Sequence, residues 1–342
     1  MLLLRGFSQP VSRHYKIVAE TKIFDPADGF FPLSDVGTVT DCTIAKRDGQ
    51  WWMYLAGTLA GKPGIHLFSA SLPAGAPLTA AGWRLTADTN NSQIALLATQ
   101  DASAPWDLKG GRHCPSYVKG WDPDCEKWVE RIYYAGGAEQ VWGPYTIGYL
   151  EWNGARWVDQ PSPVFRPEEH WEHVSVYEPN LIYADGKWKM WYVAGSNQED
   201  YLVHGFAESP NGRTHWTKHK TFASPELKVF DFRPIQTTGG YEAVFSRVWL
   251  AASPAPAETG LWWCCCDRPS SELSDWSKPI QIMNAEDRGW HSGPWKPSVH
   301  YSETDPNRMF VFFDGIYRKN EPGPFPFAFT LGCLELEWSG AP

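Results

Sequence analysis

A repeat of about sixty residues runs through the chain and is the feature that most limits its fold. Strand-like segments rich in Trp and Tyr recur, and their central aromatic residues are Tyr54, Tyr133, Tyr192, Trp249 and Phe312. The steps between these residues are 79, 59, 57 and 63 positions. A period of this size indicates one supersecondary unit stacked several times, with neighbouring units burying each other's apolar faces.

A second mark gives the same count. A Trp closes each unit, and the five closing residues are Trp83, Trp157, Trp216, Trp276 and Trp338. Their steps are 74, 59, 60 and 62 positions. Both marks count five units, and both place the longest interval between the first and the second.

The pattern inside each unit is typical of short strands. β-Branched and aromatic runs alternate with turn dipeptides such as Asp48-Gly49, Asp185-Gly186 and Asn211-Gly212. No long segment has the 3.6-residue period of an amphipathic helix. Five such units predict an all-β fold, a five-bladed β-propeller. A β-sandwich would not explain the fivefold count.

The repeat marks also predict where the blades lie. We expect one domain over residues 1–342, with blades at about 36–84, 112–158, 176–217, 231–277 and 293–338. The preceding segment, residues 1–35, is a candidate to close the ring, with a strand over residues 14–24.

Charge and hydropathy exclude several classes of partner. The formal net charge is −9, and the chain has no sustained run of Lys or Arg. Nucleic acid and anionic membranes are therefore not expected as partners, because both bind clustered cations. No apolar run approaches the roughly 18 residues that a membrane span needs. The first residues, MLLLRGFSQPVSRHYK, are too polar for a signal peptide.

The seven cysteines do not form a recognisable framework. Their number is odd and three of them, Cys264, Cys265 and Cys266, are consecutive, so we expect reduced thiols and a cytoplasmic protein. Neither a C-x2-C pair nor an H-E-x-x-H motif is present, and the chain therefore predicts no metal centre and no cofactor.

Each unit opens with a short motif that places a polar residue before a Pro-like position. These residues are Asp41, Cys114, Glu178, Arg233 and Lys296. In a propeller the innermost strands surround a central channel, so equivalent positions of the five blades converge on one funnel. Functional convergence there is one interpretation, and a chance succession of polar turn residues is the other.

The motifs resemble those of the five-bladed propeller glycosidases. The resemblance rests on Tyr177-Glu178-Pro179-Asn180-Leu181, on Gly186-Lys187-Trp188-Lys189-Met190-Trp191-Tyr192, and on Ser209-Pro210-Asn211-Gly212 before Trp216. This superfamily includes the family 43 arabinanases and xylosidases, the invertases and levansucrases, and the mannoside phosphorylases. The resemblance covers most of the chain and singles out no individual family.

The resemblance implies a pair of catalytic carboxylates. In the hydrolases of the group an Asp of the first blade is nucleophile or general base, and a Glu of the third blade is general acid. The matching residues here are Asp41 and Glu178. Glycoside cleavage needs one carboxylate on each side of the scissile bond. The alternatives without a catalytic role are an Asx turn at Asp41 and a solvated strand end at Glu178.

Two departures from the family pattern leave the chemistry open. The carboxylate expected in the second blade is replaced by Cys114, and His113 is not expected to substitute for it because adjacent strand residues face opposite ways. Arg112, Arg233 and Lys296 suggest an anion at the funnel: an acidic sugar, or phosphate as the attacking group. Alternatively the cations neutralise the carboxylates.

The sequence thus predicts an enzyme that cleaves a small glycoside or an oligosaccharide. His113 and Cys114 are expected to line the substrate pocket. Tyr177 and Trp295 are expected to shape the sugar subsite, with His291 near its hydroxyls. The alternatives are a non-hydrolytic enzyme (a lyase, a transferase or an isomerising enzyme) and a binding module without catalysis. The sugar, the linkage and the oligomeric state do not follow from the sequence.

Overall fold

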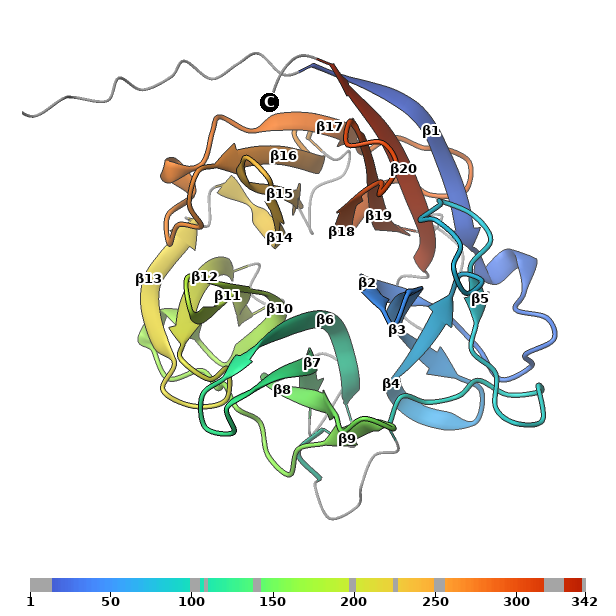
Figure 1. The fold of residues 1–342 in the computed structure, drawn as a ribbon. Coiled ribbons are helices and arrows are strands. Elements are labelled where there is room, and N and C mark those ends of the chain that lie inside the picture. Colours follow the sequence, from blue (N-terminus) through green and yellow to red (C-terminus); the bar gives the residue numbers. More distant parts are fainter. Residues whose placement is uncertain are drawn as a thin grey trace, which may run out of the picture.

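Five antiparallel blades surround a central axis in the computed structural model (Figure 1). The structure describes residues 14–98, 105–107, 110–137, 143–196, 201–223, 227–248, 256–316 and 329–339. Trp249 and residues 1–13 of the N-terminal segment lie outside this set. The predicted fold class, an all-β five-bladed propeller, is confirmed.

The first two blades share one hydrogen-bonded sheet. Their strands are β2 (Thr40–Arg47), β3 (Gln50–Leu59), β4 (Lys62–Ser71), β5 (Arg84–Leu85), β6 (Gly111–Asp122), β7 (Lys127–Gly137), β8 (Tyr145–Trp152) and β9 (Trp157–Asp159). A single parallel pairing, Ile65 with Gly111, joins β4 to β6. A Cβ at Gly111 would lie 2.2 Å from the Ile65 nitrogen, so this close approach requires glycine.

The remaining three blades are separate four-stranded sheets. The third and fourth contain β10 (Ser175–Ala184), β11 (Lys187–Ser196), β12 (Tyr201–Ser209), β13 (Thr217–Ala223), β14 (Val229–Thr237), β15 (Gly240–Arg247), β16 (Gly260–Cys266) and β17 (Ile280–Asn284). The fifth contains β18 (Pro294–Tyr301), β19 (Arg308–Ile316), β20 (Phe329–Ser339) and, from the other end of the chain, β1 (His14–Phe24).

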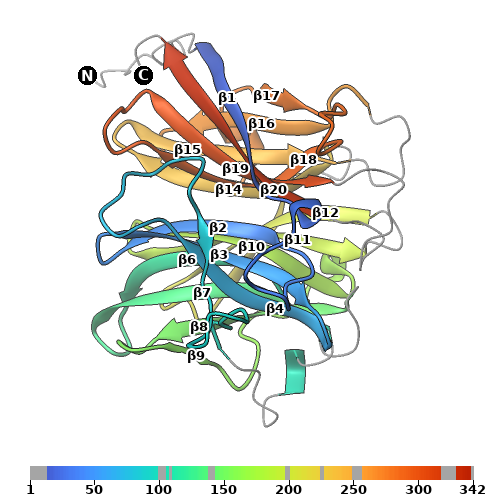
Figure 2. The ribbon, with the colours of Figure 1, turned by 90° about the vertical axis from the view of Figure 1, so that its right-hand side faces the viewer.

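β1 ties the start of the described chain to its end. It runs antiparallel to β20, from His14 opposite Ser339 to Phe24 opposite Leu331. The two strands lie side by side along the outside of the fifth blade in both views (Figures 1 and 2). This pairing covers the edge that β20 would otherwise expose.

Apolar clusters between neighbouring blades hold the propeller together. The closing residues Trp83, Trp157, Trp276 and Trp338 are each at least 93% buried in one of these clusters. A large aromatic side chain removes about 150–250 Å² from water, worth roughly 4–6 kcal/mol of transfer free energy. The Trp content therefore mainly serves the contacts between blades.

Helical structure contributes little. Short 3-10 turns occur at Pro26–Asp28, Pro105–Asp107, His170–Glu172 and Leu273–Asp275, and none of the described residues is in an α-helix. Within the described part of the chain, therefore, no helix has the length and apolar character to cross a bilayer.

The innermost strands β2, β6, β10, β14 and β18 line the axis (Figure 1). Each of them pairs with only one other strand of its own blade, so its side chains on the axial side meet those of the other four blades. This arrangement brings residues that are far apart in the sequence into one site.

Candidate active site

One residue on each innermost strand has a left-handed backbone. These five, here called the ring residues, are Asp41 (φ 52°), Cys114 (φ 55°), Glu178 (φ 50°), Asp231 (φ 57°) and Lys296 (φ 49°). Each lies at a break in the strand register, as in a β-bulge. A bulge bends the strand and re-aims its side chains, and here the same device recurs in all five blades.

The recurrence indicates a purpose beyond packing. A left-handed conformation costs a residue with a side chain roughly 1–2 kcal/mol, and such strain collects at functional sites. The ring residues are also deeply buried, with Lys296 the most exposed at 8%. Burying an ionisable group costs free energy unless the group is paired, so each ionisable ring residue is expected to have a charged or hydrogen-bonding partner.

Lys296 contacts three of the other four ring residues. Its Nζ lies 2.5 Å from Asp41 Oδ1 and 2.9 Å from Glu178 Oε1, and it donates to Cys114 Sγ at 3.8 Å. Asp41 is held further by the backbone N–H of Cys114, which donates to Oδ2 at 3.0 Å. One ammonium therefore bridges the carboxylates of the first and third blades.

The environment pushes the pKa values of the two bridged carboxylates apart. Burial alone would raise the pKa of Asp41, but the Lys296 ammonium, followed by His113 and the Cys114 N–H, holds it well below its ordinary value. Burial raises the pKa of Glu178 to about 7, with Lys296 opposing and the Asp231 and Asp41 charges adding to the rise. Asp41 is thus ionised and Glu178 is poised near neutrality.

Two further carboxylates complete the buried network. Asp314, on β19, accepts from Thr40 Oγ1 at 2.6 Å and from the Asp41 N–H at 2.8 Å, while burial and the Asp41 charge raise its pKa well above its ordinary value. Asp231 accepts from Asn180 Nδ2 at 2.6 Å, and its Oδ1 lies 3.4 Å from Arg233 Nε. Burial raises the pKa of Asp231 as well, although Arg233 and Asn180 oppose the rise, so of these four carboxyl groups only Asp41 has a lowered pKa.

The structure corrects the motif assignment in the fourth blade. The ring position there belongs to Asp231, and Arg233 follows two residues later. The other inner strands have Cys or Pro after the ring residue, whereas this blade has Phe232, so the motif was matched to Arg233-Pro234 instead. A fixed step from the central aromatic residue does not identify Asp231 either, because the intervals in the other four blades are 13, 19, 14 and 16 positions.

The structure also corrects the orientation expected for His113. Strict alternation would point it away from Cys114, but a ring nitrogen of His113, Cys114 Sγ and a carboxylate oxygen of Asp41 all lie within 4.8 Å of one another. The left-handed bulge at Cys114 breaks the alternation and turns neighbouring side chains toward the same space.

Aromatic residues form a collar next to the ring. It is built from the residues that precede the ring residues in four blades, together with Tyr145 of β8, and its members are His113, Tyr145, Tyr177, Phe230 and Trp295. Successive members contact each other, with ring centroids 4.8 to 6.3 Å apart. Trp295 also stacks on Phe329 at 5.3 Å and lies 5.0 Å from Lys296 Nζ.

Two residues predicted to bind substrate lie elsewhere. Arg112 is buried in ion pairs, with Nε donating to Asp107 at 2.8 Å and Nη1 lying 2.8 Å from Asp159. His291 Nε2 lies 2.9 Å from Glu20 of the outer strand β1. The structure therefore brings neither to the ring, whereas Asp41, His113, Cys114, Tyr177, Glu178, Trp295 and Lys296 come together, with Arg233 alongside.

In three blades, the residue two positions after the ring residue in the sequence accepts a backbone hydrogen bond from the next blade. Ser298 Oγ accepts the Ile44 N–H at 3.1 Å, Thr43 Oγ1 accepts the Tyr117 N–H at 3.3 Å, and Ser116 Oγ accepts the Leu181 N–H at 3.1 Å. We call these three hydroxyl residues the belt. In the third blade the equivalent residue is Asn180, which donates to Asp231 instead.

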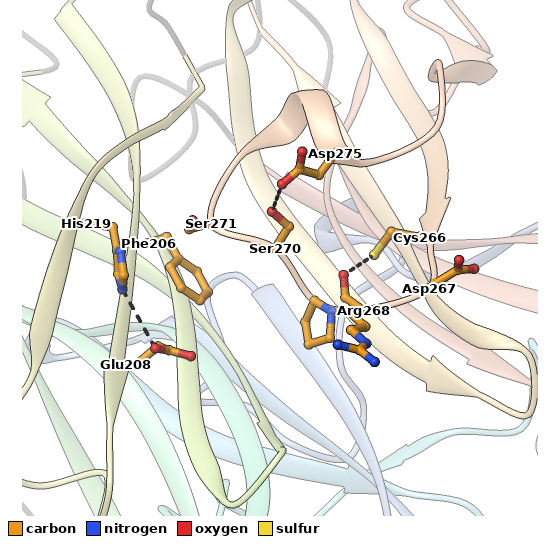
Figure 3. Close-up of a pocket in the computed structure, with 10 residues that line it drawn as sticks. Phe206, Glu208, His219, Cys266, Asp267, Arg268, Ser270, Ser271 and Asp275 are labelled. Atoms are coloured by element: carbon orange, nitrogen blue, oxygen red, sulfur yellow. Dashed lines mark hydrogen bonds and ion pairs between the residues drawn. The ribbon is translucent and has the colours of Figure 1, made fainter. Parts of the chain in front are cut away.

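Two cavities are lined by residues other than the ring residues. One, of about 390 Å³, is lined by the later residues of all five innermost strands, including Arg233. The other, of about 580 Å³, is a groove between the outer strands of the third blade and the segment that follows β16 (Figure 3). His219 and Glu208 face each other across 3.8 Å on one wall, and Cys266 and Asp267 lie on the other.

Comparison with known proteins gives a fold and no closer relative. No family model and no curated protein matches the chain. Solved structures do match. One of them, a complex of BT0996 with RGII, has 15% identity and a TM-score of 0.61, and the match covers 97% of this chain and 93% of that one.

Two further structures have similar values. A thermostable family-43 glycoside hydrolase has 13% identity and a TM-score of 0.56, with 91% and 92% of the two chains covered. The α-L-arabinofuranosidase PaAbf62A from Podospora anserina, in complex with cellotriose, has 12% identity and a TM-score of 0.59, with 93% and 95% covered. The chain therefore has the five-bladed propeller fold of these glycoside hydrolases, although at such identities no individual family can be assigned.

Proposed function

We propose that this protein is an enzyme that cleaves a glycosidic bond, with Glu178 as general acid and Asp41 as general base or nucleophile. The observation that carries the proposal is the buried pair of carboxylates that share Lys296 and have opposed pKa shifts. A glycosidase needs two carboxyl groups, one protonated by its environment to act as an acid and the other ionised to act as a base or nucleophile.

Glu178 is suited to protonate a leaving-group oxygen. A general acid works best when its pKa lies near the operating pH, and burial brings Glu178 to about 7. Its surroundings are the aromatic collar and Cys114, which keep bulk water from stabilising its charge. The same burial would strengthen its interaction with a substrate oxygen.

Asp41 is suited to act on the other side of the bond. Its carboxylate is ionised and is fixed by Lys296 and the Cys114 N–H. Lys296 Nζ lies 2.5 Å from Asp41 Oδ1 and 2.9 Å from Glu178 Oε1. These two oxygens therefore cannot be further apart than the sum of the two distances. The anomer of the first product assigns the role: retention requires a nucleophilic Asp41, and inversion requires a base.

The contacts of the cations favour water over phosphate as the acceptor. Lys296 faces Asp41 and Glu178, Arg233 faces Asp231, and Arg112 lies away from the ring in pairs with two other carboxylates. Each cation thus neutralises carboxylates of the protein itself. This supports hydrolysis of a neutral glycoside or oligosaccharide, and cellotriose bound to PaAbf62A is a ligand of that kind.

The test is a sugar-release screen of a broad glycoside panel, with and without phosphate. Wild type is compared with Glu178→Gln and Asp41→Asn. Glu242→Gln is the matched control, because Glu242 is a buried carboxylate of the fourth blade that accepts from Trp263 and Tyr301. We expect phosphate-independent release that falls by about 10²–10⁴-fold in the Glu178 variant and persists in the control.

The other outcomes identify the alternatives. Release of a sugar phosphate that requires phosphate would make the protein a phosphorylase. Consumption of a glycoside without hydrolysis would indicate a lyase or a transferase. Binding without turnover, unchanged in Glu178→Gln and Asp41→Asn, would contradict an enzymatic role.

A further inference from the structure

Three potential metal ligands of different chemical types meet at the ring. A carboxylate oxygen of Asp41, a ring nitrogen of His113 and the Sγ of Cys114 lie within 4.8 Å of one another, and all three residues are buried. They come from two blades and have no metal-binding spacing in the sequence. The bulge at Cys114 brings them together, because it turns His113 toward the ring.

The His113 side chain supplies the nitrogen ligand of the group. Metals bind the neutral imidazole. His113 Nε2 is buried and has no hydrogen-bond partner among the residues that the structure describes. A buried nitrogen without a hydrogen-bond partner destabilises the folded protein, and a metal ion would remove that cost.

The donor set discriminates between classes of cation. Ca²⁺ and Mg²⁺ take oxygen ligands. A thiolate, an imidazole and a carboxylate together suit Zn²⁺ and similar borderline-soft ions, with bonds of about 2.0–2.3 Å. Ligand atoms within 4.8 Å of one another are close enough to converge on one such ion.

We propose that Asp41, His113 and Cys114 form a binding site for a thiophilic divalent cation of the Zn²⁺ type. On binding, the Cys114 thiol releases its proton to solvent, and the Asp41 carboxylate exchanges the Lys296 ammonium for the metal ion. Lys296 keeps its other contact, 2.9 Å from Glu178. Because a proton is released, affinity increases with pH.

The proposal goes beyond the proposed function and has a consequence for it. A metal ion on Asp41 occupies the carboxylate that hydrolysis would use, so metal and glycoside exclude each other. Only this consequence rests on the proposed function. The site itself is tested by spectroscopy, which needs no turnover, so the two ideas fail separately.

The test is a titration of the full-length, reduced and metal-free protein with Co²⁺, which reports on its ligands by colour. We expect one tightly bound ion per chain, with visible bands of a four-coordinate site and a near-ultraviolet band from a thiolate. Cys114→Ser removes the thiolate band. His113→Asn keeps it and weakens binding by roughly 10–100-fold or more.

The matched control is Cys266→Ser. Cys266 lines the groove of Figure 3 with His219 and Asp267 nearby, which makes it the alternative thiol for an adventitious ion. We expect this variant to retain the wild-type spectrum. X-ray absorption of the Zn²⁺-loaded wild type should show one sulfur at about 2.3 Å with nitrogen and oxygen neighbours at about 2.0–2.2 Å, a measurement that needs no variant.

The proposal fails on any of three results. The first is a wild type without a thiolate band at saturating Co²⁺. The second is a band that survives Cys114→Ser and disappears in Cys266→Ser. The third is an absorption spectrum of the Zn²⁺-loaded wild type without a sulfur neighbour.

Discussion

At the residue scale, Glu178 determines how activity should depend on pH. Its proposed role as general acid requires the protonated form, and the fraction in that form falls as pH rises through its pKa of about 7. Asp41 stays ionised far into the acid range, because its pKa is held well below its ordinary value. We therefore expect kcat/KM, which reports the free enzyme, to be constant at mildly acidic pH and to fall above about 7. A rate that still increases beyond about pH 9, roughly two units above that pKa, would contradict this assignment.

Lys296 should control both the pH profile and stability. It lowers the pKa values of Asp41 and Glu178, so Lys296→Met should move the alkaline limb of the kcat/KM profile to higher pH. Removing one partner of a buried ion pair also costs about 3–5 kcal/mol, measurable by chemical denaturation.

The control for Lys296 is Lys218→Met. Lys218 is another well-covered lysine, with Nζ 2.8 Å from Glu172, and it belongs to the outer strand β13. It should lose stability and keep the wild-type pH profile. An alkaline limb that moves equally in both variants would show that Lys296 acts only through stability.

Individual site residues were predictable where a blade kept its motif. The motif that opens each unit pointed to Asp41, Glu178 and Lys296, and the structure brings all three together. Asp231 was missed because Phe232 replaces the usual Pro. Asp314 was missed because it lies on β19, a second strand, and reaches the ring only through folding.

At the scale of the element, the belt hydroxyls should stabilise the packing of neighbouring innermost strands. Ser298→Ala and Ser116→Ala each leave a buried backbone N–H without its acceptor, that of Ile44 or Leu181. We expect each to reduce the free energy of unfolding by about 1–3 kcal/mol. Ser274→Ala, in an exposed 3-10 turn, is the control. Equal stability of all three variants would show that the belt does not couple the blades.

The strands themselves follow from alternation and turn dipeptides, but the bulges do not. Left-handed backbone is usually signalled by Gly or Asn, whereas here Asp, Cys, Glu and Lys adopt it. Local preference therefore argues against the conformation, and contacts between blades impose it. For this reason the orientation of His113 cannot be deduced from the alternation of side chains along its own strand, β6.

At the scale of the whole molecule, the pairing of β1 with β20 should govern stability. A variant without residues 1–24 exposes the β20 edge and loses a strand of the fifth blade. Exposed edges promote association. We expect a lower midpoint of thermal unfolding and aggregation that increases with protein concentration, measured by calorimetry and light scattering. An unchanged midpoint would show that three strands suffice for that blade.

The whole-molecule architecture was the most predictable level. Two independent aromatic marks indicated five units, and most of the closing tryptophans fill the contacts between blades. Periodicity reports such packing directly, because each unit must bury the same faces. Chemistry at the axis has no such repetition, since the five blades contribute four different types of ring residue.

The order of the ring along the chain has a consequence for synthesis. Asp41 leaves the ribosome early and Lys296 late, and β20 must still follow before β1 has its partner. A nascent chain therefore holds the first carboxylate long before its counterion exists. The site becomes complete only when the last blade has folded, so a chain whose synthesis is unfinished lacks a complete site.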